Sequence, residues 1–140
     1  MYQTKKQKEE ARNNVIKWLM NYALDHGVGV VFTYVAKKDD PSESFPEYNV
    51  AVINANYMNI DEIPFIIGHE IGHLMLNHSK KKFYASPANR IRMERAANEF
   101  SLDLLTEYCD LHEIYFYNAL TFAEAFGIPK SCYYLLDEAL

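Results

Sequence analysis

Several features that would place a protein in a specialised class are scarce or missing from this sequence of 140 residues. It has two cysteines, Cys109 and Cys132, which are too few for a disulfide framework and do not form a closely spaced metal-ligand pair. It has no apolar run near 18 residues, so we expect no membrane-spanning helix. Residues 1–12 are charged and lack the apolar core of a secretory signal. We therefore expect a cytoplasmic protein with free thiols.

The sequence also lacks an excess of positive charge. It has 14 lysines and arginines against 19 aspartates and glutamates, which gives a formal net charge of −5. A general nucleic-acid binder is normally basic, so we expect no direct contact with nucleic acid. Hydrophobic residues (49%) and charged residues (24%) occur in proportions that are ordinary for a globular protein. The length is sufficient for one domain with a real core.

The most informative stretch is His69-Glu70-Ile71-Gly72-His73, which reads His-Glu-x-x-His inside an apolar run. Residues four apart lie on one face of a helix, with β-carbons about 5–6 Å apart, so both imidazoles can converge on one ion. Glu70 then lies beside the open side of that ion, where a general base acts. The alternative is a pair of ordinary core histidines, but buried polar groups need partners, and a metal ion provides one.

The flanking residues predict that this motif lies on a buried helix. Asp61 is the expected N-cap, and Pro64 is tolerated in the first turn because amides there lack partners. The helix is apolar on nearly all sides, which is typical of a central helix. Residues 78–87 are polar and basic and predict a loop. His78 lies five positions after His73, and helical geometry rotates it off the ligand face.

A catalytic zinc typically takes three protein ligands and one water, so a third ligand is needed. Residues 88–108 predict a helix whose small residues would allow close packing against the metal helix. On that face Glu94 fits best as the ligand, with a surface ion pair as the alternative. Asn98, one turn later, would bind the outer nitrogen of a ligand histidine. Glu99 is rotated by about 100° from Asn98 and is expected to face solvent.

The sheet is expected to be small and antiparallel. Strands are predicted at residues 28–35 and 48–54, separated by a loop at 37–47, with a third strand near Tyr57. The second strand ends in Val52-Ile53-Asn54 and leads into the metal helix. If this strand is the exposed edge, these three residues can bind an extended peptide by adding a strand to the sheet. A purely structural strand is the alternative.

The paired motifs resemble the ImmA/IrrE family of bacterial and phage zinc metallopeptidases. The resemblance rests on residues 69–76, followed by Glu94-x-x-Ala97-Asn98-x-Phe100-Ser101. It extends upstream to Val52-Ile53-Asn54 and downstream to residues 123–129. Many relatives carry an acid where this chain has Ala96, a departure that touches no proposed ligand.

The resemblance implies a gluzincin-like site, with His69, His73 and Glu94 as ligands and Glu70 as the base. The expected ion is Zn²⁺, although such sites also accept other divalent ions. It further implies an intracellular endopeptidase whose partner is a protein substrate, a helix-turn-helix repressor encoded nearby on a phage or mobile element. The expected fold class is α+β, with a small antiparallel sheet packed on a mainly helical zincin-like core. Its single domain (1–140) would comprise an N-terminal helix (1–27), the sheet (28–57), the metal-site helices (60–108) and a helical cap (110–140).

Two other functions stay open at this point. The protein can be a non-catalytic module that keeps zinc for stability and antagonises the repressor by binding it. An intact Glu70 argues against this, because zinc binding alone does not require that residue. The protein can also be a toxin–antitoxin partner with an unrelated activity. If it is a peptidase, the developing oxyanion needs a donor besides zinc, and the candidates are a tyrosine such as Tyr115 or Tyr117 or a displaced loop residue.

Overall fold

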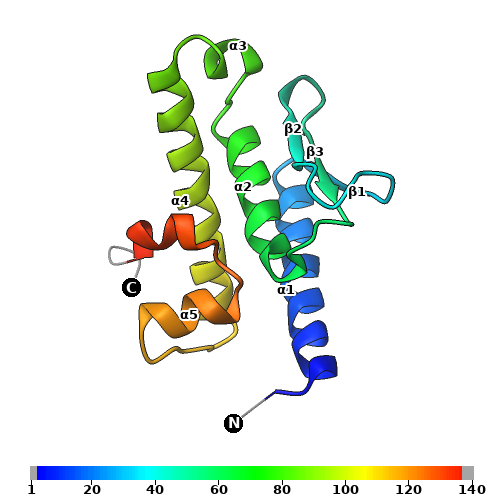
Figure 1. Cartoon of the computed structure of the whole chain (residues 1–140), viewed down its shortest axis with the longest axis vertical. Coiled ribbons are helices and arrows are strands. Elements are labelled where there is room, and N and C mark those ends of the chain that lie inside the picture. The colour runs from blue at the N-terminus through cyan, green and yellow to red at the C-terminus, as the bar shows by residue number, and fades with distance from the viewer. Residues whose placement is uncertain (1–2, 137–140) are drawn as a thin grey trace.

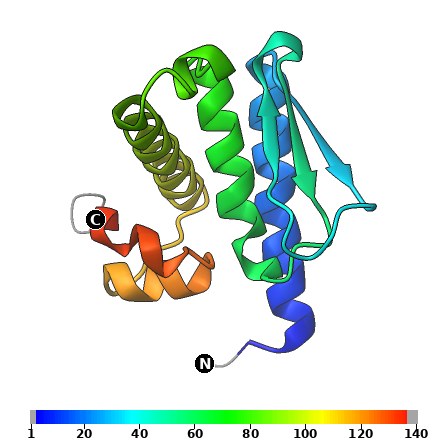
Figure 2. The same ribbon diagram turned by 45° about the horizontal axis from the view of Figure 1, so that its top comes forward.

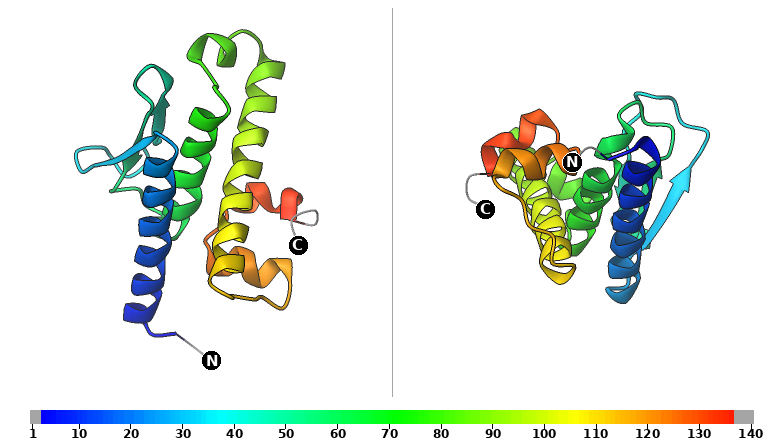
Figure 3. Two further views of the ribbon diagram at one scale, coloured as in Figure 1. Left: turned by 180° about the vertical axis from the view of Figure 1, so that it is seen from behind. Right: turned by 90° about the horizontal axis from the view of Figure 1, so that it is seen from below.

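Helix α2 (Ile63–Met75) lies at the centre of the fold, between α1 (Lys5–Asp25) and α4 (Pro87–Leu111) (Figures 1 and 3). The computed structural model describes residues 3–136, so the end of the predicted C-terminal cap, residues 137–140, lies outside the described residues. A small sheet covers α1 and α2 on the side away from α4 (Figure 2). The predicted α+β class is confirmed. The other elements are β1 (Gly29–Thr33), β2 (Glu43–Phe45), η1 (Pro46–Tyr48), β3 (Val50–Asn54), η2 (Ile60–Glu62), α3 (Lys80–Phe83), α5 (Ala119–Ala125) and η3 (Lys130–Leu135).

The sheet is mixed, which corrects the prediction of an antiparallel pair. Strand β3 is central, with β1 parallel to it on one side and β2 antiparallel to it on the other. Strand β2 lies in the segment expected to be a loop, and Tyr57 is not in a strand. With only three residues, β2 is too short to give a periodic pattern. The edge strand beside α2 is therefore β2.

The prediction that Val52, Ile53 and Asn54 bind a peptide required β3 to be an edge strand. Strand β3 is central, so this prediction is wrong. Both sides of this strand are already paired, so it cannot accept a further strand. Asn54 is 1% exposed, and its side-chain amide donates to the carbonyl oxygens of Lys37 (2.6 Å) and Asp40 (2.9 Å). These bonds hold the loop between β1 and β2.

Helices α1 and α2 begin in different ways. Helix α1 begins with a capping box, in which Thr4 and Gln7 exchange side-chain to backbone hydrogen bonds. The predicted N-cap of α2 is wrong. Asp61 lies in the preceding turn η2, and α2 begins after Glu62 with no side-chain cap. The Asp61 carboxylate instead accepts a hydrogen bond from Arg12 at 3.0 Å, which ties α1 to the start of α2.

Helices α1, α2, α4 and α5 all end in a Schellman motif. A residue with positive φ follows each C-cap, and the next N–H returns to a carbonyl five residues earlier. The turns reverse the chain at once, so each helix is followed by a segment that folds back over its last turn. The residues with positive φ are Gly27 (76°), Asn77 (56°), Glu113 (55°) and Gly127 (61°).

Gly27 and Gly127 offer a matched test of the packing around the start of α2. A β-carbon at Gly127 would lie 2.0 Å from the carbonyl oxygen of Asp61, whereas nothing lies within 4 Å of one at Gly27. Alanine in a left-handed conformation costs roughly 1–2 kcal/mol at either position. We expect Gly127→Ala to cost at least about 2 kcal/mol more than Gly27→Ala in urea unfolding, because backbone must move. Equal costs would contradict this packing.

Candidate metal centre

Close packing between α2 and α4 sets the geometry of the site. Two glycines of α2 face α4: a β-carbon at Gly68 would lie 2.3 Å from Ser101 Oγ, and one at Gly72 would lie 3.2 Å from the Ala97 Cα. Ser101 Oγ also donates to the carbonyl oxygen of Phe65 at 2.7 Å. The small residues expected on α4 therefore let the two backbones approach closely, and side chains from α4 can reach the histidines of α2.

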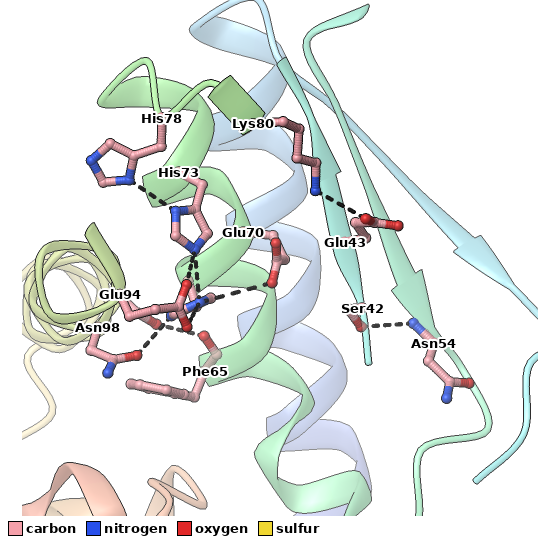
Figure 4. Close-up of polar contacts among 12 residues, drawn as sticks. Ser42, Glu43, Asn54, Phe65, Glu70, His73, His78, Lys80, Glu94 and Asn98 are labelled. Carbon is pink, nitrogen blue, oxygen red and sulfur yellow. Dashed lines mark hydrogen bonds and ion pairs between the residues drawn. The ribbon is translucent and has the colours of Figure 1, made fainter. Parts of the chain in front are cut away.

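Three potential ligands, His69, His73 and Glu94, meet between these helices. Figure 4 labels two of them, His73 and Glu94. Glu94 of α4 places one carboxylate oxygen 2.7 Å from Nε2 of His73 and the other 3.4 Å from Nε2 of His69. The two Nε2 atoms are 3.0 Å apart. Around a tetrahedral zinc with bonds of about 2.0–2.1 Å, ligand atoms are separated by roughly 3.3 Å. The donor set fits one metal ion, and it is the only such cluster within residues 3–136.

The charges in this cluster favour a cation. Burial acts to raise the pKa of Glu94, but hydrogen bonds from the two imidazoles outweigh it and hold this pKa well below its usual range. Burial acts to lower the pKa of His69, but its contacts with Glu94 and Glu70 raise it overall. Glu94 is therefore held as a carboxylate, which is the form that binds a metal ion.

The outer nitrogens of both histidines also have partners. Nδ1 of His69 donates to Oδ1 of Asn98 at 2.7 Å, as the spacing of Glu94 and Asn98 predicted. Nδ1 of His73 meets Nδ1 of His78 at 2.9 Å, a contact that the sequence analysis missed. The predicted rotation of His78 off the ligand face requires α2 to continue through residue 78, but α2 ends at Met75 and the chain turns back.

Glu70 lies on the side of α2 that faces β2, next to the ligand cluster (Figure 4). Its carboxylate is 4.0 Å from Nε2 of His69, and the residue is 8% exposed. Burial raises the pKa of Glu70 to about 7. Glu99, by contrast, forms a surface ion pair with Arg95 at 2.7 Å, in agreement with the prediction that it faces solvent.

The cluster opens into a cleft of about 620 Å³. Its rim carries an ion pair in which Lys80 of α3 donates to Glu43 of β2 at 2.9 Å. Tyr115 and Tyr117 do not line this cleft. They are 79% and 96% exposed and border a separate, smaller pocket near α5, so they are wrong as oxyanion donors. The cleft is lined instead by two other tyrosines, Tyr57 and Tyr84, and by the buried free thiol of Cys132.

Comparison with known proteins agrees with this geometry. Residues 23–132, which include the whole ligand cluster, match the model of the IrrE N-terminal-like domain, a peptidase family. The chain belongs to this metallopeptidase family. The predicted resemblance is thereby confirmed for the IrrE-type domain. No curated protein and no solved structure matches the chain. None of the described helices is long and apolar enough to cross a membrane.

Metal analysis of two glutamate variants tests the site. Glu94→Ala removes a ligand, so we expect the affinity for Zn²⁺ to fall by more than the 10–100-fold that loss of an outer partner costs. Glu99→Ala removes another carboxylate of α4, one that forms a surface ion pair with Arg95. This variant should bind zinc like the unaltered protein. Titration against a chromophoric chelator measures both. Unchanged affinity in Glu94→Ala would rule out the proposed ligand set.

Proposed function

We propose that this protein is a zinc-dependent endopeptidase that acts in the cytoplasm and cleaves a regulatory repressor protein. One observation carries the proposal: three ligand atoms converge beside the buried Glu70 at the base of an open cleft. Membership of the IrrE-type family supports peptidase chemistry. The repressor as substrate rests on the resemblance of the sequence motifs to ImmA/IrrE proteins.

The residues of the chain divide the chemistry among them. A zinc ion held by His69, His73 and Glu94 would polarise the scissile carbonyl and lower the pKa of a bound water. Glu70 accepts the proton of the attacking water and returns it to the leaving amine nitrogen. Its raised pKa suits both halves of this transfer, because a carboxyl group that titrates near neutral pH can take up and release a proton. Asn98 keeps the ring of His69 in the orientation that directs Nε2 at the ion.

Strand β2 is the proposed docking edge for the substrate. Within the described chain it pairs with β3 alone, and Ser42, Glu43 and Ser44 line the cleft. Asn54 directs its backbone N–H toward β2, where it donates to Ser42 Oγ. Because backbone direction alternates along a strand, Glu43 and Phe45 face β3, and the peptide groups of Ser44 face the free edge. An extended substrate segment can add to this edge and cross the metal centre.

The variant Glu70→Gln tests catalysis. It removes the general base while the three ligands stay, so we expect cleavage of the repressor encoded by the neighbouring gene to fall by at least about 100-fold with zinc content unchanged. Mass spectrometry of the products and metal analysis measure the two quantities. A zinc-loaded Glu70→Gln protein that still relieves repression in cells would exclude the peptidase and favour a binding module.

The variant Ser44→Pro tests the docking edge. Proline removes one N–H at the free edge, and a net loss of one hydrogen bond of about 0.5–1.5 kcal/mol raises KM by roughly 2–10-fold. We expect kcat to stay the same for a peptide that spans the mapped cleavage site. Ser44→Ala keeps the N–H and serves as the control. An unchanged KM in a stably folded Ser44→Pro protein would place the substrate elsewhere.

A further inference from the structure

The ligand histidine His73 is almost fully enclosed, and both of its ring nitrogens are engaged. Nε2 faces Glu94 and His69, while Nδ1 points the opposite way and meets Nδ1 of His78 at 2.9 Å (Figure 4). His73 is 6% exposed, so the outer nitrogen depends on a protein partner. The ring of Phe83 lies edge-on at 6.2 Å from the ring of His73 and adds no polar group. His78 is therefore the hydrogen-bond partner of the outer nitrogen of His73, Nδ1.

The Schellman motif at the end of α2 brings His78 to this position. Asn77 has a left-handed φ of 56°, and the N–H of His78 donates to the carbonyl oxygen of His73 at 2.9 Å. In this motif the residue after the left-handed one returns over the residue five positions earlier. The same backbone bond that ends the helix thus places the imidazole of His78 beside the imidazole of His73.

The other three Schellman motifs of the chain provide an internal comparison. This motif is usually accompanied by an apolar contact between the two residues that its longer hydrogen bond joins. Three of the four motifs here have a small residue or a cysteine on the helix and valine or isoleucine after the turn. Only α2 has two imidazoles at these positions. The pairs are Ala23–Val28, Cys109–Ile114, Ala123–Ile128 and His73–His78.

The direction of the imidazole–imidazole hydrogen bond follows from the ligand role of His73. A histidine that binds a metal through Nε2 carries its proton on Nδ1. Nδ1 of His73 is then the donor, and Nδ1 of His78 is the acceptor. His78 must therefore be neutral, with its own proton on Nε2. Asn98 accepts in the same way from Nδ1 of His69, so each ligand histidine donates to one acceptor.

We propose that His78 is a positioning residue of the metal centre, which accepts the Nδ1 proton of His73 and so fixes the ring and the tautomer that direct Nε2 at the ion. The proposal rests on the metal site of the proposed function. His78 acts through His73 and is not itself a ligand, since its Nδ1 is turned to the outer side of that ring and away from Glu94 (Figure 4). The local turn supplies this partner, whereas the partner of His69 comes from α4.

Two substitutions separate positioning from a general effect on the fold. His78→Ile introduces isoleucine, which occupies the corresponding position in the Schellman motifs of α4 (Ile114) and α5 (Ile128). The metal-free variant should therefore unfold at the same urea concentration as the unaltered protein or a higher one. It removes the acceptor, and we expect its affinity for Zn²⁺ to fall by about 10–100-fold. His78→Asn keeps an acceptor close to the position of Nδ1 and should stay within about threefold of the unaltered affinity.

The tautomers give a readout that a merely structural role would not affect. Long-range ¹H–¹⁵N spectra of the zinc-loaded protein should show His73 protonated at Nδ1, and His78 protonated at Nε2 with a free Nδ1. Full zinc affinity in His78→Ile, the opposite tautomer in His78, or a zinc-bound nitrogen in His78 would each overturn the proposal. Loss of affinity in His78→Asn equal to that in His78→Ile would overturn it as well.

Failure of this proposal can be distinguished from failure of the proposed function. If the unaltered protein binds no zinc, the proposed metal site is wrong, and the proposed peptidase function is excluded as well. If the unaltered protein binds zinc and Glu70→Gln abolishes cleavage, the peptidase stands whatever the His78 variants do. Zinc affinity of the unaltered protein is therefore measured first, and the ratios for the variants are taken against it.

Discussion

The close approach of α2 and α4 is the constraint on which the metal centre depends. Gly68 and Gly72 leave no room for a side chain between the two helices, and the backbone of α4 lies against them. This distance allows Glu94, on a different helix, to reach both Nε2 atoms. A wider separation would leave His69 and His73 on the apolar helix α2 without Glu94 as a partner, at a cost in desolvation. The small residues that let α2 and α4 approach closely therefore also provide the buried histidines with a polar partner.

The three candidate metal ligands were predictable from the sequence because each of them lies on a regular helix. Helical geometry fixes the relation of His69 to His73 and of Glu94 to Asn98 without knowledge of the rest of the fold. Only the contact between the two helices is non-local, and the small residues of α4 indicated it. The family resemblance rested on the same local spacing.

The parts that sequence analysis missed depend on non-local pairing or on a single dihedral angle. Strand β2 has three residues, and its place at the sheet edge is decided by its pairing with β3. The parallel pairing of β1 and β3 likewise follows from a connection that no local pattern encodes. His78 contacts His73 because Asn77 takes a left-handed φ, which asparagine tolerates but does not require. The left-handed φ of Asn77 thus places the imidazole of His78 beside His73, where a continued helix would have rotated it away.

The candidate metal centre comes from one short stretch of the chain, residues 69–98. The most distant contact within it, between His69 and Asn98, spans 29 positions and lies inside one helical hairpin formed by α2, α3 and α4. Loop-closure entropy for such a hairpin is small, and local contacts form early. The Arg12–Asp61 pair, in contrast, spans 49 positions. A bound ion would therefore stabilise this hairpin through contacts that are local in the sequence, without the more distant pairing of α1 with the start of α2.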